Sequence, residues 1–260
     1  MNKSKIEWCD YTFNPVTGCL HGCEYCYSKV FIQRFSGRWD KESLRTKGGN
    51  SELHDLEKPM SRHTNGKNRD RPVHSVQAPF PYGFDPTFHR YRLDEPQKVK
   101  KPQNIFVCSM ADLFGEWVPD EWIQQVFEAC EKAPQHRYIF LSKNPRRYGE
   151  LYDKKLLPVS NKYWFGVTKT IDDTKFIWSV PYRWFVSIEP IMGSFSMASF
   201  ERVKWAIIGQ ETGTRKGKVI PKREWIENIV NECRKQNVPV FLKNNLSSVW
   251  GEPLIQEYPW

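Results

Sequence analysis

Six short apolar runs recur along the chain, with segments of helical periodicity between several of them. The runs span 104–108, 137–141, 163–167, 184–188, 203–208 and 238–242. Stretches such as 105–107 and 138–141 are apolar without polar alternation, which is typical of parallel strands that are buried on both faces. The pattern predicts an α/β fold, built either as a βα barrel or as an open parallel sheet.

Two helical segments follow from the spacing of apolar residues. One begins near Pro119, where a proline and two acidic residues suit a first turn, and its apolar stripe reaches Cys130. The other runs from Pro221 toward Gln236 and carries Cys233 on its stripe. Both cysteines are therefore expected in the core as buried thiols.

Residues 36–103 break this rhythm. The segment is rich in glycine, proline, histidine and charge, and no packed element of any length is expected in it. We interpret it as a loop-rich insertion in a single domain that spans 1–260. Its basic stretch 90–101 either contacts phosphate or is simply solvated. Its histidines lack the spacing of a zinc module and are expected on the solvated surface: His54, His63, His74 and His89.

A CxxxCxxC motif is formed by Cys19, Cys23 and Cys26. Three thiolates at this spacing can bind three corners of a 4Fe-4S cluster, because soft sulfur ligands suit iron and a short loop reaches adjacent irons. Gly18 and Gly22 permit the positive φ angles that wrapping a cluster requires. A fourth cysteine at comparable spacing is absent, so one iron is left for an exogenous ligand.

An iron without a protein thiolate can chelate the amino and carboxylate groups of S-adenosylmethionine. An electron passed into the sulfonium would then cleave a carbon–sulfur bond and release a 5′-deoxyadenosyl radical. In such chemistry the protein orients and shields the cofactor. The motif therefore predicts an enzyme, with its catalytic residue, its substrate and its oligomeric state left open.

The motif resembles that of the radical S-adenosylmethionine superfamily, in which this loop follows the first strand of a partial TIM-type barrel. The resemblance implies a partial (β/α) barrel of about six parallel strands, a reductant such as flavodoxin or ferredoxin, and a place for Tyr25 beside the adenine of the cofactor. More closely, the chain is similar to a phage- and bacteria-associated uncharacterised family of radical-S-adenosylmethionine-like proteins. The segments that carry this similarity are 8–15, 106–114, 141–145, 166–168, 187–190 and 209–213.

Polar residues follow the predicted strands, and in a parallel barrel ligands gather at those ends. Hydroxyls and charges near a core need partners, so packing alone does not explain such a ring. The residues expected to converge above the cluster and bind the cofactor are Ser109, Asp112, Ser142, Lys143, Thr168, Ser187, Glu189 and Glu211. In the superfamily's GxIxGxxE pattern Gly209 matches the second glycine and joins this set, whereas Glu211 falls one residue early and Trp205 replaces the first glycine.

The net charge of +9 and the pI near 9.1 favour an anionic partner such as nucleic acid or a nucleotide. The N-terminus lacks the apolar core of a signal peptide, and no stretch approaches the length of a membrane span. We therefore expect a cytoplasmic protein without membrane contact. In a reducing compartment the 7 cysteines are better explained as ligands and isolated thiols than as disulfides.

Two other functions are open. A zinc knuckle for nucleic acid could use the three motif cysteines together with His21 or Cys9, although a knuckle needs no ring of polar strand ends. His21 is otherwise expected to face solvent or a backbone carbonyl, and Cys9 to be a core thiol. The second alternative is a cluster-bearing structural or regulatory protein that never cleaves the cofactor.

Overall fold

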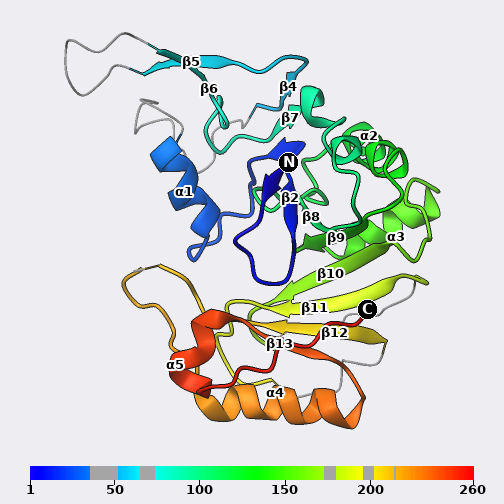
Figure 1. The fold of residues 1–260 in the computed structure, drawn as a ribbon. Helices are drawn as coiled ribbons and strands as arrows, with labels where there is room; N and C mark the ends of the chain where they lie inside the picture. The colour runs from blue at the N-terminus through cyan, green and yellow to red at the C-terminus, as the bar shows by residue number, and fades with distance from the viewer. Residues whose placement is uncertain (36–51, 65–73, 173–179, 196–201, 214) are drawn as a thin grey trace.

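The computed structural model describes residues 1–35, 52–64, 74–172, 180–195, 202–213 and 215–260. Its centre is an eight-stranded sheet in the order β1-β2-β8-β9-β10-β11-β12-β13 (Figure 1). Strands β1 and β2 are antiparallel, and every other neighbouring pair is parallel. The strands are β1 (Asn2–Lys3), β2 (Tyr11–Phe13), β8 (Asn104–Val107), β9 (Arg137–Ser142), β10 (Tyr163–Lys169), β11 (Arg183–Ile188), β12 (Val203–Ile208) and β13 (Val240–Leu242).

All six strands predicted from the apolar runs are present as β8 to β13, so the predicted α/β class is confirmed, and β2 adds a further parallel strand. Along β8 to β13, each strand is hydrogen-bonded to the one that follows it in the chain. The described residues form an open, mostly parallel sheet and no closed barrel. At the β13 edge of the sheet lies the C-terminal segment, which pairs with β13 through an antiparallel bridge between Phe241 and Gln256.

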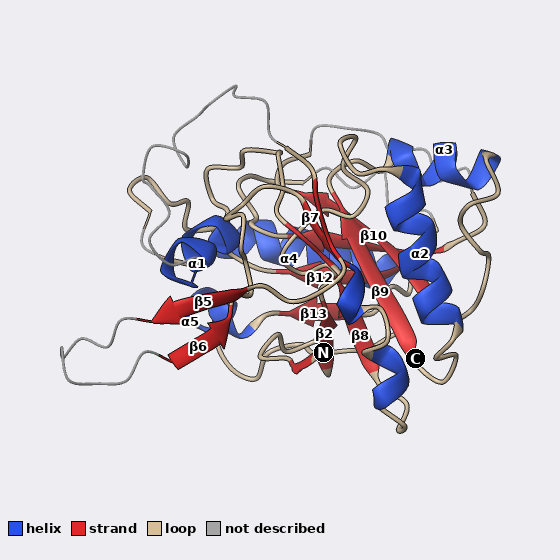
Figure 2. Cartoon of the chain, turned by 90° about the horizontal axis from the view of Figure 1, so that it is seen from above, coloured by secondary structure: helices blue, strands red, loops and turns tan. Residues whose placement is uncertain are grey.

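The longer helices pack on one face of this sheet (Figure 2). They are α2 (Asp120–Glu131), α3 (Arg146–Asp153) and α4 (Arg223–Lys235), while α1 (Tyr27–Phe35), α5 (Ser247–Trp250) and the 3-10 turns η1 (Arg90–Arg92), η2 (Pro96–Lys98) and η3 (Asn244–Leu246) lie in the connections. Helices α2 and α4 confirm the two predicted from periodicity, and both Cys130 and Cys233 are buried as expected. No helix in the described ranges has the length and apolar character needed to cross a membrane.

The opposite face of the sheet carries a second, smaller apolar cluster, which we call the aromatic floor. Its members come from alternate positions along neighbouring strands, because successive side chains of a strand point to opposite faces. Residues Phe106, Ile139 and Trp164 are direct neighbours in the strand register. The floor consists of Trp8, Cys9, Phe106, Ile139, Trp164, Phe185, Trp205, Ile207 and Phe241.

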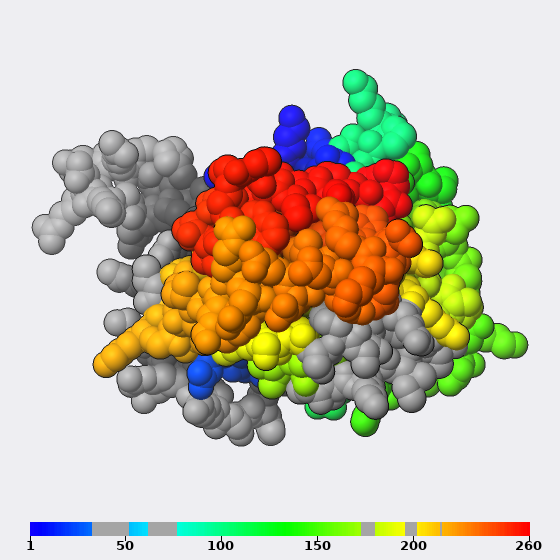
Figure 3. All heavy atoms as spheres, turned by 90° about the horizontal axis from the view of Figure 1, so that it is seen from below, coloured from blue at the N-terminus to red at the C-terminus, as the bar shows by residue number. Residues whose placement is uncertain are grey.

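The C-terminal segment closes the aromatic floor from outside the sheet. The indole of Trp205 donates a hydrogen bond to the backbone oxygen of Glu257 at 2.9 Å, and the Trp260 ring packs edge-on against Trp205 with centroids 5.1 Å apart. Tyr258 donates to the backbone oxygen of Glu7 at 3.0 Å. Figure 3 shows this segment, red, beside α4, orange. On the face of the sheet opposite the helices, side chains are therefore closely packed toward the amino ends of the strands.

The expectation of no packed element in 36–103 is wrong where the structure describes this segment. It contains β4 (His54–Leu56), β5 (Ser61–Thr64), β6 (His74–Gln77) and β7 (Thr87–His89), and with β3 (Val16–Thr17) they form a β3-β7-β4 sheet and a β5-β6 hairpin. Residues 36–51 and 65–73 lie outside the described ranges. The elements are too short for a periodic signal, yet β7 is buried along its length.

The prediction that His89 lies on the surface is therefore wrong, because its side chain is fully buried. Its Nε2 lies 2.9 Å from Oγ1 of Thr17 and its Nδ1 lies 3.1 Å from the hydroxyl of Tyr91. Burial lowers the pKa of His89 to about 3. The neighbouring Arg92 is also occupied by protein, donating to the backbone oxygens of Asn14 and Pro79 at 2.9 and 3.2 Å. Partners within the fold therefore hold His89 and Arg92, whereas Lys98, Lys100 and Lys101 are exposed.

Candidate functional site

A cavity of about 390 Å³ opens where the parallel strands end, a size within the range of small-molecule sites. It is lined by the motif cysteines Cys19, Cys23 and Cys26, by Tyr25, and by all eight polar residues predicted at the strand ends: Ser109, Asp112, Ser142, Lys143, Thr168, Ser187, Glu189 and Glu211. Parallel strands bring these residues together because their carboxyl ends share one edge.

Other lining residues were missed by sequence reasoning. Apolar side chains form much of the wall, namely Ile6, Trp8, Phe84, Phe106, Met110, Ala111, Leu141 and Pro190. The polar residues of the wall that were not predicted are Lys5, Glu7, Tyr27, Ser28, Gln210, Thr212, Lys243 and Asn245. Lys243 and Asn245 follow β13, the last strand, so the rule that strand ends carry the site could have found them. Lys5 precedes any parallel strand and carries no such signal.

The cysteine loop, residues 18–26, follows β3 of the small sheet and begins with a glycine. Gly18 has a φ of +86°, and a Cβ built on it would lie 2.2 Å from the backbone oxygen of Asp85, so only glycine fits there. Its amide donates to the backbone oxygen of Met110 at 3.0 Å, and that of Cys19 donates to Phe84 at 3.1 Å. Gly22, with a φ of +68°, turns the chain in open space. The loop is thus fixed to the end of β8 at its start.

The second half of the loop leads directly into α1. The amide of Cys26 donates to the backbone oxygen of Cys23 at 3.2 Å, and the helix begins at Tyr27. The first turn of a helix carries a partial positive charge that suits anionic ligands. Burial raises the pKa of the Cys19 thiol to about 12, so binding of a metal by this thiol requires loss of a proton.

Tyr25 lies between the cysteine loop and the strand ends. Burial and the adjacent Cys23 raise the pKa of its phenol above the ordinary value, and its hydroxyl is in hydrogen-bond contact with Cys23 and Thr170. The Nζ atom of Lys143 lies 6.0 Å from the centre of its ring. One face of the ring is therefore close to a cation, and the phenol links the loop to the segment after β10.

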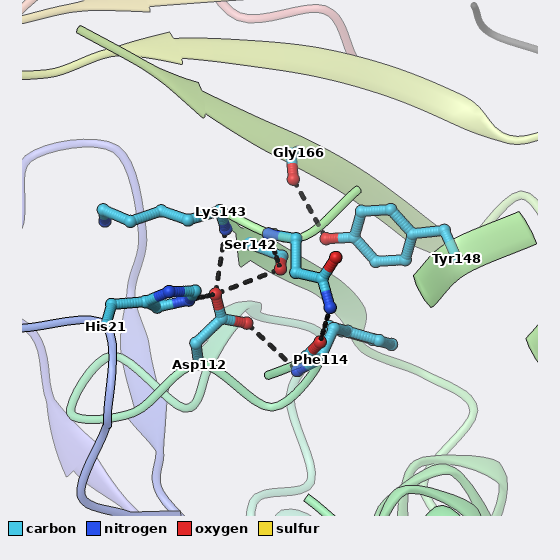
Figure 4. A network of polar contacts seen from close by, with 8 residues as sticks. His21, Asp112, Phe114, Ser142, Lys143, Tyr148 and Gly166 are labelled. Atoms are coloured by element: carbon cyan, nitrogen blue, oxygen red, sulfur yellow. Dashed lines mark hydrogen bonds and ion pairs between the residues drawn. The ribbon is translucent and has the colours of Figure 1, made fainter. Parts of the chain in front are cut away.

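Asp112 is not available to a ligand in the way predicted. Its Oδ2 accepts hydrogen bonds from Nε2 of His21 at 2.7 Å, Oγ of Ser142 at 3.1 Å and the amide of Lys143 at 2.8 Å, and its Oδ1 accepts from the amide of Phe114 at 3.0 Å (Figure 4). The expectation that His21 faces solvent or a backbone carbonyl is corrected by the same contact. Ser142 is likewise committed to Asp112.

Glu211 is also satisfied within the protein. Its two carboxylate oxygens accept from Nε and Nη2 of Arg215, each at 2.7 Å, and this contact lowers the pKa of the Glu211 carboxyl. The guanidinium of Arg215 also lies 3.9 Å from the carboxylate of Glu24 in the cysteine loop. Such a bidentate pair favours a positioning role for Glu211.

Glu189 and Lys243 form an ion pair in the cavity wall. They come from the ends of β11 and β13, and the strand between them contributes Gly209. A Cβ on Gly209 would lie 2.9 Å from Cδ of Lys243 and 3.1 Å from Cδ of Glu189. The absence of a side chain at Gly209 therefore leaves room for the ion pair. Gly209 itself does not line the cavity. The pair presents one negative and one positive group to any bound molecule.

The remaining predicted residues differ in whether their hydroxyl groups have hydrogen-bond partners. Ser109 donates from Oγ to Oδ1 of Asn14 at 3.1 Å, which fixes the turn after β8. Thr168 and Ser187 are direct neighbours in the register of β10 and β11, and neither hydroxyl has a hydrogen-bond partner within the described part of the chain. Both are therefore available to a ligand.

Gln210 supplies one further unsatisfied polar group. Its amide and backbone are paired with Asn245, but its Oε1 is buried without a partner. In the described ranges, no three His, Cys, Asp or Glu side chains converge closely enough to hold a single metal ion. A cubane cluster differs from a mononuclear site in this respect, since each thiolate binds a different iron.

A family model described as a protein of unknown function, DUF5131, matches residues 3–254. The chain belongs to this family. Comparison with curated proteins and with solved structures found no match. The family match covers both the cysteine loop and every strand of the large sheet after β1.

Proposed function

We propose that this protein is a radical S-adenosylmethionine enzyme whose Cys19, Cys23 and Cys26 hold a 4Fe-4S cluster. The observation that carries the proposal is that three thiols on one short loop line a cavity of small-molecule size at the ends of parallel strands. An unidentified anionic substrate, nucleic acid or a nucleotide, is proposed from the positive net charge. A reducing cytoplasmic setting and a flavodoxin or ferredoxin reductant belong to the same proposal.

The donor set fits the cluster. Thiolates are the usual ligands of iron–sulfur clusters, the glycines at both bends of the loop permit close backbone approach, and the N-terminal end of α1 offers favourable dipoles to an anionic centre. When bound, the cluster supplies the electron that cleaves the sulfonium of S-adenosylmethionine and yields a 5′-deoxyadenosyl radical. The tasks of the chain are to bind, orient and exclude water.

The groups left unsatisfied in the cavity suit the cofactor. The hydroxyls of Thr168 and Ser187 line the cavity and have no hydrogen-bond partner among the described residues. The Glu189–Lys243 pair offers a charge of each sign, which complements an amino acid's ammonium and carboxylate groups. Tyr25 and the apolar wall offer surface for an adenine ring. The aromatic floor below them excludes water from that end of the cavity.

The strand order supports a partial barrel as the finer description of the fold. Strands β8 to β13 pair in chain order with their helices on one face, as they do in (β/α) barrels. A doubly wound sheet would reverse direction at a switch point and carry helices on both faces. The aromatic floor then corresponds to the interior of the partial barrel.

The zinc-knuckle alternative has less support. Tetrahedral zinc requires four donors around one ion. His21 already contacts Asp112, and the Sγ of Cys9 lies 3.2 Å from the hydroxyl of Ser4. The second alternative, a cluster-bearing protein that never cleaves the cofactor, differs from the proposal only in its chemistry.

Anaerobic reconstitution tests the proposal. We expect about four iron and four sulfide ions per chain, a visible absorption band that dithionite bleaches, and release of 5′-deoxyadenosine after S-adenosylmethionine is added. Cys23→Ala should abolish all three signals. Cys9→Ala removes a thiol outside the cavity and is the matched control. Zinc in place of iron supports the knuckle, a bleached cluster without 5′-deoxyadenosine supports the inert protein, and full signals in Cys23→Ala exclude the ligand assignment.

A further inference from the structure

His21 lies inside the cysteine loop but does not point to solvent. Its Nε2 lies 2.7 Å from Oδ2 of Asp112, and its ring packs edge-on against Trp117 with centroids 4.8 Å apart. About a fifth of the His21 side chain is exposed, at 21%, against 7% for the side chain of Asp112. The residue is therefore held from two directions, by a carboxylate and by an indole ring.

Asp112 joins three separate segments of the chain at this point. Besides His21 from the loop, it accepts from the amide of Phe114 in the turn after β8, and from Ser142 and Lys143 at the end of β9. Figure 4 shows the donors arranged around the two carboxylate oxygens. A buried carboxylate with four donors is fully satisfied, so its position is fixed by the sheet.

Among the residues that the structure describes, no backbone hydrogen bond ties the middle of the loop to the sheet. Gly18 and Cys19 are bonded to the backbone of Met110 and Phe84, whereas the amide of Cys26 is bonded to Cys23 within the loop itself. His21 stands midway along this stretch, which the side chains of Glu24 and Tyr25 also join to Arg215 and Thr170. Its bond to Asp112 is a short contact from that stretch to the end of the central sheet.

We propose that His21 and Asp112 form an anchor that holds Cys19 and Cys23 in the geometry required for metal binding. Both are positioning residues, and neither is a ligand of the metal or of the cofactor. The hydrogen bond requires an N–H donor at Nε2 of His21 and an acceptor at Asp112. The proposal rests on the proposed function only for the identity of the metal centre, since the anchor orders the loop before any metal binds.

Two substitutions separate the hydrogen bond from the ring contact. His21→Phe keeps a ring against Trp117 and removes the donor, whereas His21→Gln keeps an N–H donor and removes the ring. If the anchor is the hydrogen bond, the phenylalanine variant should loosen the loop and the glutamine variant should retain most of its order. Ser142→Ala is the matched control, because it removes another donor to the same oxygen of Asp112 and leaves His21 in place.

Hydrogen–deuterium exchange on the metal-free chain gives a readout that does not depend on activity. In His21→Phe we expect amides of 19–26 to exchange about tenfold faster than in the wild type, with unchanged exchange in 137–142 and 163–169. After anaerobic reconstitution, the same variant should bind iron about 10- to 100-fold more weakly, with an altered electron paramagnetic resonance spectrum of the reduced cluster. His21→Gln should lie close to the wild type in both measurements.

The outcomes distinguish this inference from the proposed function. Wild-type exchange rates and iron binding in His21→Phe would overturn the anchor, and so would equal loosening in His21→Phe and His21→Gln. Faster exchange in His21→Phe alone supports the anchor even if the wild-type chain takes up no iron–sulfur cluster. In that last case the proposed function fails and the ordering role of His21 stands.

Discussion

The two ends of the sheet's inner face have opposite character. Toward the amino ends of the strands, the aromatic floor fills the face with rings such as Trp164 and Trp205, and the C-terminal segment covers them. Toward the carboxyl ends, the same strands carry Thr168 and Ser187, which line a cavity. The same strands thus contribute to a packed core at their amino ends and to the candidate site at their carboxyl ends.

The change occurs within two residues in β9 and β11 and within four residues in β10. In β10, Trp164 belongs to the floor, Gly166 lies under the ring of Phe185, and Thr168 lines the cavity. The comparison shows that large side chains at one end rigidify the strands while small and polar ones at the other end leave space for a ligand. Stability and binding should therefore respond to substitutions at different ends.

The largest expected effect is at the packed end. Trp205 is fully buried and its indole donates to Glu257, so Trp205→Ala leaves a cavity and should lower the free energy of unfolding by about 3–5 kcal/mol. Ser187→Ala, at a residue that lines the cavity, should change it by less than about 1 kcal/mol. Urea denaturation measures both. Equal losses in the two variants would show that the two ends do not differ in packing.

A smaller effect is expected where the floor meets the cavity. A Cβ on Gly166 would lie 2.2 Å from the ring of Phe185, and that ring has no free space because Phe185 is fully buried. Gly166→Ala should therefore destabilise the protein by about 1–3 kcal/mol through overpacking. Differential scanning calorimetry provides the measurement, with Gly149→Ala on α3 as control because nothing lies within 4 Å of its added Cβ. An unchanged melting temperature in Gly166→Ala would mean that the boundary is loosely packed.

Acid should weaken the small β3-β7-β4 sheet, which leads into the cysteine loop, before the aromatic floor. Burial lowers the pKa of His89 to about 3, so the unfolded chain binds a proton more readily than the folded one. Stability from this residue is complete above the unfolded pKa of about 6.5 and is lost as the pH falls toward 3, with about 2 kcal/mol lost at pH 5. The floor residues carry no group that titrates in this range.

The control for this effect is His89→Gln, which cannot titrate. Unfolding free energies at about pH 7 and pH 5 should differ less in His89→Gln than in the wild type, and hydrogen exchange at pH 5 should increase in 16–19 before it increases in 163–169. His89 contacts Thr17, two residues from Cys19, which is why this part of the chain should respond first. If His89→Gln loses as much unfolding free energy between about pH 7 and pH 5 as the wild type does, His89 is not the source of the acid sensitivity.

Much of this fold could be predicted because its signals are long or repeated. Continuous apolar runs such as those in β10 and β12 identified the parallel strands, and the stripe that carries Cys233 identified α4. The convergence of the strand-end residues then followed from parallel order alone. The sequence could not decide between an open sheet and a closed barrel, because what lies at the edge of β13 is set by contacts such as Phe241 with Gln256, which have no pattern in sequence.

The partners of individual side chains could not be predicted either. His21 and Asp112 are far apart in sequence, and each is a common surface residue type, so nothing local shows that they bond. The strand-end rule could have found Lys243 itself, but not its pairing with Glu189, which depends on the glycine between their strands. His89 was expected in solvent because a three-residue strand is too short to show burial by periodicity. Sequence therefore located the site better than it assigned roles within it.

The smallest effect on stability should accompany a clear effect on binding. In Gly209→Ala the new methyl group meets Cδ of Lys243 at 2.9 Å and Cδ of Glu189 at 3.1 Å, and both are flexible side chains that can move toward the cavity. The free energy of unfolding should fall by less than about 1 kcal/mol, because the displaced groups enter open space rather than packed core.

Displacement of the ion pair should nevertheless weaken S-adenosylmethionine binding to the reconstituted protein by about tenfold, since one misplaced charged contact costs roughly 1.5 kcal/mol. Equilibrium dialysis measures the affinity, with Gly166→Ala as the opposite case, in which stability falls and affinity changes little. A loss of stability in Gly209→Ala as large as that in Gly166→Ala would contradict the comparison, because it would mean that the carboxyl ends are packed as tightly as the floor. Unchanged affinity would instead remove the Glu189–Lys243 pair from the set of cofactor contacts.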